Sequence, residues 1–178
     1  MSSLQEILTK VSRGEISPAA AELLLRESQI AELGFATIDL QRQARRGRPE
    51  VIYCEGKTTE QILKIARTMV DAGQPVLFTR LRADQGEAIA REFDSVDLIP
   101  NPLARSAFLA ANRPAKKSGV VGILAAGTSD LPVAEEAAFT AECLGSDVER
   151  AYDVGVAGLH RLLARADLLV RARVLIVI

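Results

Sequence analysis

The clearest pattern of apolar and polar positions lies in the last third of the chain. Residues 120–125 are all apolar or glycine, which is typical of a strand buried on both faces of a parallel sheet. A small polar turn follows at residues 126–130, and Pro132 stands where the first turn of a helix tolerates a missing N–H. Residues 147–153 predict a second strand, and a second helix begins at Val156. The pattern therefore predicts a strand–helix–strand unit with parallel strands, followed by another helix.

The first two thirds of the chain alternate between helical and extended patterns. Apolar residues at helical spacing predict four helices, at 4–13, 17–33, 59–73 and 83–93. Short apolar runs predict strands at 35–38, 50–54 and 76–80, and a further apolar stretch lies at 95–99. We therefore expect a helical hairpin, followed by a small α/β layer over residues 34–112.

A charged segment containing proline, residues 113–118, separates the two patterns and is predicted to be a linker. The predicted domains are residues 1–117 and 118–178. The predicted fold class is α/β: a helical hairpin and small α/β layer, then a flavodoxin-like, doubly wound parallel sheet. The last segment, 173–178, is an apolar strand with neither a turn nor a covering helix after it. We therefore expect this sheet to be incomplete and the chain to be truncated.

Polar side chains follow both predicted strands of the C-terminal pattern. A right-handed crossover brings the carboxyl ends of these strands to one edge of the sheet, which places Ser129 and Asp130 near His160 and Arg161. A strand, a small polar turn and a helix N-terminus together form a common anion-binding arrangement, so phosphate is the expected ligand. In the structural alternative, Ser129 and Asp130 only cap a helix, and His160 and Arg161 are a partly exposed pair at a helix end.

Basic residues gather in a second stretch. Arg42, Arg45 and Arg46 fall at helical offsets of three and four, so they project from one face. Such runs are usually solvated helix ends, whereas the functional alternative is a clamp for phosphate or carboxylate groups. Lys57 follows Gly56 just before a predicted helix and is a further phosphate-binding candidate. The Gly-Lys-Thr triplet lacks the earlier glycine of a nucleoside-triphosphatase loop, which argues against triphosphate hydrolysis.

Composition narrows the classes of function. The 178 residues include 22 basic and 23 acidic side chains, and a net charge of −1 gives no general reason to bind nucleic acid or an anionic membrane. Aromatic residues make up only 4%, which disfavours a protein that stacks nucleobases. The N-terminus lacks a signal-peptide core, no stretch approaches a membrane span, and Cys54 and Cys143 fit neither a disulfide framework nor a metal motif. We therefore expect a cytoplasmic protein.

Two strings in the C-terminal third carry a family resemblance. They are GILAAGTSDLPVAEEA at residues 122–137 and DVGVAGLHRL at residues 153–162. Both resemble turns of the purine-synthesis carboxylases that act on aminoimidazole ribonucleotide, which read roughly GSxSD and SAHR. This chain departs from them at residues 126–128, where that family is serine-rich, and at Gly158-Leu159, where it has Ser-Ala.

A third string points to a sister family. It follows a D-x-x-R-x-x-R-x-G-x-P-E-V pattern and then GKT, matched here by Asp39, Arg42, Arg45, Gly47, Pro49, Glu50, Val51, Gly56, Lys57 and Thr58. With an N-terminal half that the purine carboxylases lack, the chain resembles the LarB family over most of residues 30–178. That family comprises the pyridinium-3,5-biscarboxylic acid mononucleotide synthases of nickel-pincer cofactor biosynthesis.

The LarB resemblance implies a reaction. Nicotinic acid adenine dinucleotide would be carboxylated at C5 of its pyridinium ring by carbon dioxide or bicarbonate, its phosphoanhydride would be hydrolysed to release AMP, and Mg²⁺ is the expected ion. A pyridinium ring is electron-poor, so a nucleophile such as a cysteine thiolate must first add to it. The family carries that cysteine later than this chain reaches, and we expect Cys54 and Cys143 to be buried structural thiols instead. A homo-oligomer, assembled through the carboxylase-like domain, is also implied.

The resemblance also implies roles for individual residues. His160 and Asp130 are the catalytic candidates, His160 as a proton shuttle and Asp130 as a ligand of ribose hydroxyls or Mg²⁺. The substrate-binding candidates near the ring are Gly127, Thr128, Ser129, Gly158 and Arg161, with Arg161 holding the transferred carboxylate. The candidates for the dinucleotide phosphates are Arg42, Arg45 and Lys57.

The sequence leaves two alternative functions open. One is an aminoimidazole ribonucleotide carboxylase or mutase, which the strand–helix–strand site favours and the N-terminal extension opposes. The other is a catalytically inert nucleotide-binding or assembly module.

Overall fold

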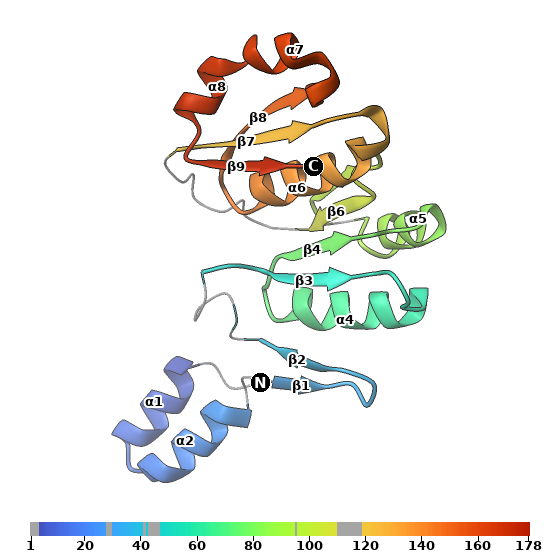
Figure 1. The fold of residues 1–178 in the computed structure, drawn as a ribbon. Helices are drawn as coiled ribbons and strands as arrows, with labels where there is room; N and C mark the ends of the chain where they lie inside the picture. Colours follow the sequence, from blue (N-terminus) through green and yellow to red (C-terminus); the bar gives the residue numbers. More distant parts are fainter. Residues whose placement is uncertain (1–3, 28–29, 41, 43–46, 95, 110–118) are drawn as a thin grey trace.

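The computed structural model describes residues 4–27, 30–40, 42, 47–94, 96–109 and 119–178 (Figure 1). The helices are α1 (Leu4–Ser12), α2 (Pro18–Glu27), α4 (Thr59–Asp71), α5 (Ala83–Glu92), α6 (Leu131–Cys143), α7 (Leu159–Leu163) and α8 (Ala166–Arg171). The strands are β1 (Ile30–Glu32), β2 (Thr37–Asp39), β3 (Glu50–Tyr53), β4 (Val76–Thr79), β5 (Leu98–Asn101), β6 (Ser106–Leu109), β7 (Val120–Ala125), β8 (Asp147–Tyr152) and β9 (Val174–Val177). Among the described residues, no helix combines the length and the apolar character needed to cross a membrane.

The N-terminal helices form the predicted hairpin, with Ile7 of α1 and Ala21 of α2 both buried. The prediction of one helix over residues 17–33 is wrong at its end. Residues 30–32 form β1, which pairs antiparallel with β2, and the Leu33 N–H donates to the carbonyl of Ala36 at 2.8 Å. Gly34 has φ 84°, a left-handed conformation that glycine adopts readily in such a turn. Cross-strand pairing has here overridden a local helical pattern.

The N-terminal sheet has four strands in the order β3-β4-β6-β5. Strands β3 and β4 are parallel, whereas β6 runs antiparallel to both β4 and β5. Helices α4 and α5 pack on one face of the sheet, where Ile62, Phe78 and Ile89 are fully buried. The two helices and the strands β3 and β4 follow the sequence pattern, but the short strand β6 was not predicted.

The C-terminal sheet has three parallel strands in the order β8-β7-β9. In chain order this is second, first, third, which is how a flavodoxin-like sheet begins. Helix α6 covers one face, and α7 and α8 lie over the other (Figure 1). The predicted α/β class with a flavodoxin-like parallel sheet is therefore confirmed.

Helix α6 lies between the two sheets. Ala138 packs with Ile123 of the C-terminal sheet, whereas Phe139 packs with Phe108 of the N-terminal sheet. A helix with apolar residues on more than one side is buried on more than one side. The two sheets thus both pack against one helix. The predicted domain boundary, between residues 117 and 118, lies outside the described residues.

The carboxyl ends of the parallel strands point the same way. In Figure 1 the arrowheads of β3, β4, β7, β8 and β9 are all directed toward one side of the molecule. The turns that follow β4, β7 and β8 therefore lie on that side, which is where open α/β sheets bind ligands.

Candidate active site

The loops that follow β7 and β8 are joined by backbone hydrogen bonds. The Gly155 N–H donates to the Ala126 carbonyl at 3.2 Å, and the Val154 N–H donates to the Ala125 carbonyl at 3.1 Å. A Cβ atom at residue 155 would lie only 3.0 Å from the Ala126 carbonyl oxygen, so the close approach of the loops favours glycine there. The structure therefore places the Thr128–Asp130 turn and the segment before α7 side by side.

In the loop after β7, the Asp130 carboxylate hydrogen-bonds other groups of the same loop. Asp130 accepts a hydrogen bond from the Gly127 N–H at 3.0 Å and one from the Ser129 hydroxyl at 3.4 Å. Its side chain makes no capping hydrogen bond to α6, but its bond to the Gly127 N–H caps the short 3-10 turn Thr128–Asp130 that leads into α6, a role close to the structural alternative. The Gly127 N–H and the Ser129 hydroxyl both donate within the loop, although Ser129 is exposed, so the exposed Thr128 hydroxyl is the donor that this loop leaves for a ligand.

In the loop after β8, Asp153 and Gly158 contact the side chain of Arg161. Its guanidinium forms an ion pair with Asp153, while its Nε atom is buried and has no hydrogen-bond partner among the described residues. A Cβ atom at residue 158 would lie 2.5 Å from Nε, so the guanidinium lies directly over Gly158. His160, one position before Arg161, is exposed at the start of α7. The segment after β8 therefore carries an exposed imidazole and, next to it in sequence, a guanidinium held over Gly158.

The substitution Gly158→Ala is expected to displace the Arg161 guanidinium without disturbing the fold, because only the end of a flexible side chain lies in the way. Loss of a charge-assisted hydrogen bond of about 1.5–3 kcal/mol should weaken binding of an anionic substrate by about tenfold or more. Isothermal titration calorimetry measures the affinity and thermal unfolding the stability. Ala157→Ser, at an exposed neighbouring position, is the matched control. Unchanged affinity in Gly158→Ala would remove Arg161 from the binding site.

Both cysteines are buried. Cys54 is 0% and Cys143 7% exposed, and burial raises the pKa of the Cys54 thiol to about 12. A thiol with that pKa is not a thiolate at neutral pH. The prediction that these two are structural thiols rather than the nucleophile agrees with their burial.

A buried polar cluster that the sequence did not reveal joins α6 to β8. Glu135 of α6 is only 8% exposed and accepts hydrogen bonds from the Arg150 Nε at 2.9 Å and the Tyr152 hydroxyl at 2.5 Å. Arg150 also donates to Glu142 at 2.7 Å. Burial works to raise the pKa of the Glu135 carboxyl, but donors including Tyr152, Arg150 and Asn101 outweigh it and lower the pKa overall. The only signal in the sequence was a charged residue within an alanine-rich helix.

The lowered pKa of Glu135 predicts a pH dependence of stability. A carboxyl whose pKa is lower in the folded than in the unfolded protein contributes stability that is complete above its ordinary pKa of 4.5 and is lost as the pH falls through the folded value. Urea midpoints measured from about pH 6 to about pH 3 should therefore fall less steeply in Glu135→Gln than in the wild type. The exposed Glu60→Gln is the control and should follow the wild type. Parallel curves for Glu135→Gln and wild type would contradict this assignment.

The candidates for phosphate binding in the N-terminal part are not gathered at one place. Arg42 pairs with Glu50 at 3.1 Å, at the start of β3, whereas the Lys57 amine donates to the Tyr53 carbonyl at 2.7 Å, at its end. The residues that anchor them are about 10 Å apart along the strand. Arg45 lies outside the described residues. Lys57 is thus at the carboxyl edge of the sheet and Arg42 is anchored at the opposite end of β3.

Two arginines that the sequence did not single out stand at the carboxyl edge of the N-terminal sheet. Arg80 follows β4 and pairs with Glu136 of α6 at 2.8 Å, and Arg105 lies in the turn between β5 and β6. Both have positive φ values, 57° and 48°, which are uncommon for residues other than glycine. Such strained positions are frequent at functional sites, and only the folded structure exposes them.

The loops offer few ligands for the implied Mg²⁺. Among the described residues, no group of three or more His, Cys, Asp or Glu side chains is placed to hold a metal ion. Magnesium is often bound through one or two carboxylates together with substrate phosphates, rather than by an all-protein cage. Of the two loop carboxylates, Asp153 is paired with Arg161, so Asp130 is the one that fits such a role, and a metal held there would neutralise phosphate charge.

Comparison with known proteins adds two findings. Residues 30–111 match the family model of the LarB/PurE-like N-terminal domain. The chain is also 36% identical, over 167 residues, to the uncharacterized protein MJ0165 of Methanocaldococcus jannaschii. That match covers 90% of this chain, which spans 64% of the length of the archaeal relative.

Proposed function

We propose, from the premise that the chain is LarB/PurE-like over residues 30–111, that this protein is a carboxylase acting on nicotinic acid adenine dinucleotide. The family match supports a carboxylase or mutase in general. The finer proposal is carboxylation of C5 of the pyridinium ring, with hydrolysis of the phosphoanhydride to release AMP. Because the chain spans 64% of its archaeal relative, both activities are proposed for the whole protein.

One observation carries this proposal. The loop containing Thr128, Ser129 and Asp130 and the loop leading to His160 and Arg161 are tied together at the carboxyl edge of one parallel sheet. Hydroxyl donors, a carboxylate, an imidazole and a guanidinium are thereby available within one region. That set can bind an anionic nucleotide and move a proton, which are the two tasks that ring carboxylation requires.

The proposed chemistry assigns a task to each of these side chains. A nucleophile adds to the electron-poor ring, C5 then forms a bond to carbon dioxide, and a base removes the proton from C5 before the nucleophile leaves. His160 is the proposed base, because it is exposed, follows directly on the loop after β8 and can accept a proton near neutral pH. Arg161 is proposed to hold the new carboxylate, and Ser129 a phosphate or the existing ring carboxylate. The buried thiols of Cys54 and Cys143 are not the proposed nucleophile.

The test is incubation of the protein with nicotinic acid adenine dinucleotide, bicarbonate and Mg²⁺. Chromatography measures AMP, and mass spectrometry detects a pyridinium product that has gained one carboxyl group. Parallel reactions with aminoimidazole ribonucleotide test the purine alternative. Formation of the carboxylated pyridinium supports the proposal. Turnover of aminoimidazole ribonucleotide alone, or of neither substrate, contradicts it.

A further inference from the structure

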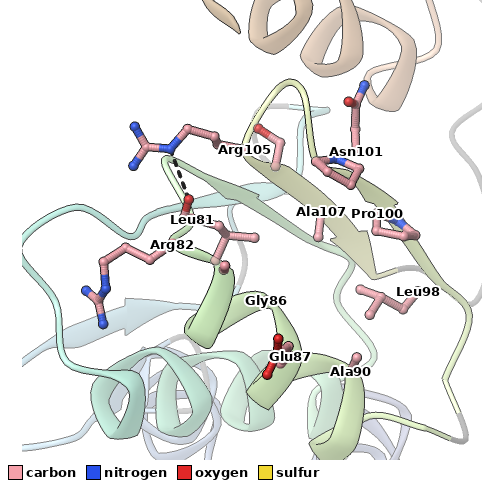
Figure 2. Close-up of a pocket in the computed structure, with 13 residues that line it drawn as sticks. Leu81, Arg82, Gly86, Glu87, Ala90, Leu98, Pro100, Asn101, Arg105 and Ala107 are labelled. Carbon is pink, nitrogen blue, oxygen red and sulfur yellow. Dashed lines mark hydrogen bonds between the residues drawn. The ribbon is translucent and has the colours of Figure 1, made fainter.

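A pocket of about 550 Å³ lies between α5 and the β5–β6 hairpin (Figure 2). Its volume is within the range of about 300–1,000 Å³ that is usual for small-molecule sites. Small residues of α5, Ala83, Gly86 and Ala90, form one wall, and Pro100 and Ala107 lie across from them. Two walls of small apolar residues suit a flat ring system better than a branched aliphatic group. The pocket is separate from the loops after β7 and β8.

Gly86 has no structural explanation in the fold. It lies within the helix α5, where glycine is among the least favourable residues. A Cβ atom there would meet no heavy atom within 4 Å, so packing within the protein does not require glycine. A missing side chain that faces an open pocket is explained if a ligand approaches the helix closely at this point.

Arg105 is fixed at one end of the same pocket. Its Nε donates to the Leu81 carbonyl at 3.0 Å, and the Leu81 N–H donates back to the Arg105 carbonyl at 2.7 Å (Figure 2). Its two terminal nitrogens form no hydrogen bond or ion pair with any of the residues described. A guanidinium held by its Nε, on a backbone with φ 48°, is preorganised to receive an anion.

The remaining charges of the pocket favour a ligand with both an anionic group and hydrogen-bond donors. Arg82 lies on the same side as Arg105 in Figure 2 and is paired with Asp84 at 2.8 Å. Glu87 lines the pocket away from the two guanidiniums and can accept hydrogen bonds from hydroxyl or amino groups. A nucleoside monophosphate supplies a flat ring, donor groups and an anion together.

We propose that this pocket binds a nucleoside monophosphate group, with the base against Gly86 and the phosphate at Arg105. Naming this group as the adenylate half of the dinucleotide rests on the proposed function. Asn101 lines the pocket and lies close enough to Glu135 of α6 to help lower the pKa of that carboxyl, and Asp130 lies five residues before Glu135. At 1.5 Å rise per residue, that is about 8 Å along the helix direction. The pocket and the loop after β7 therefore flank the same end of α6.

Calorimetric titration of AMP into the full chain, without bicarbonate, tests the pocket directly. Gly86→Leu fills the wall and Arg105→Gln removes the guanidinium, so each should weaken AMP binding by about tenfold or more. Leucine is a better helix former than glycine, so Gly86→Leu should melt at the same or a higher temperature than wild type. Arg91→Gln, on α5 but not among the pocket-lining residues, is the matched control and should bind AMP as the wild type does.

Adenosine and inorganic phosphate are titrated separately in the same way. Each is expected to bind more weakly than AMP. Phosphate binding as tight as AMP would overturn the proposal, because the ring would then contribute nothing. Unchanged AMP affinity in Gly86→Leu, or no binding of AMP to the wild type, would also overturn it. The pocket and the proposed function are tested separately. If AMP binding depends on Gly86 but no carboxylated product forms, the pocket proposal stands and the carboxylation proposal is rejected.

Discussion

Replacing His160 by asparagine is expected to lower kcat for ring carboxylation by about 100- to 10,000-fold, the range usual for loss of a general base. His160 is the single histidine of the chain and is exposed at the edge where the two loops meet. Asparagine retains polarity and approximate size but cannot accept a proton near neutral pH. Steady-state kinetics with nicotinic acid adenine dinucleotide measures the effect, and KM should change much less than kcat.

Two comparisons make this result specific. Arg165→Gln, at an exposed position just after α7, should retain wild-type kcat and so exclude a general effect of changing this segment. Because the imidazole is exposed, His160→Asn should also melt within a few degrees of the wild type. Wild-type turnover by His160→Asn would remove the residue from its proposed catalytic role.

The substitution Phe139→Ala is expected to lower the free energy of unfolding by about 3–5 kcal/mol, the usual effect of deleting a buried phenyl ring. Phe139 is 6% exposed on α6, where it packs with Leu77 and Phe108 of the N-terminal sheet. The substitution opens a cavity between α6 and that sheet. Since α6 also covers the C-terminal sheet, the loss should affect both parts of the chain. Urea denaturation followed by circular dichroism measures the change.

Val133→Ala is the matched control on the same helix. Val133 is 42% exposed, so its truncation should change the free energy of unfolding by only about 0.5 kcal/mol or less. A loss below about 1 kcal/mol in Phe139→Ala would mean that α6 contributes little to the packing of the N-terminal sheet.

Many of the secondary-structure elements could be predicted because their patterns are local. The run at residues 120–125 packs on both faces in the structure and is fully buried over residues 122–125, in agreement with its unbroken apolar character. Gly73 ends α4 with φ 70°, where the helical spacing of apolar residues also ends. In each case the residues that decide the conformation are within a few positions of each other.

The sequence-based predictions fail where a strand pairs with a segment that is distant in the sequence. Residues 30–32 continue a helical pattern but form β1, because β2 offers a partner strand. Strand β6 has four residues and no distinctive period, and its identity depends on pairing with β4 and β5 on either side. Contacts between strands are long-range in sequence, and a local pattern does not encode them.

The sequence by itself determined the α/β class, the parallel strands of the C-terminal sheet and the polar loops at their carboxyl ends. Those properties follow from periodicity and from the handedness of the crossover, which act along the chain. Only the tertiary structure decided that Arg42 and Lys57 are anchored at opposite ends of β3, that Glu135 is buried against β8, and that Gly86 and Arg105 share a pocket. These relations depend on how separate helices and strands pack against one another, and packing is fixed by the volumes and hydrogen bonds of all the neighbours together.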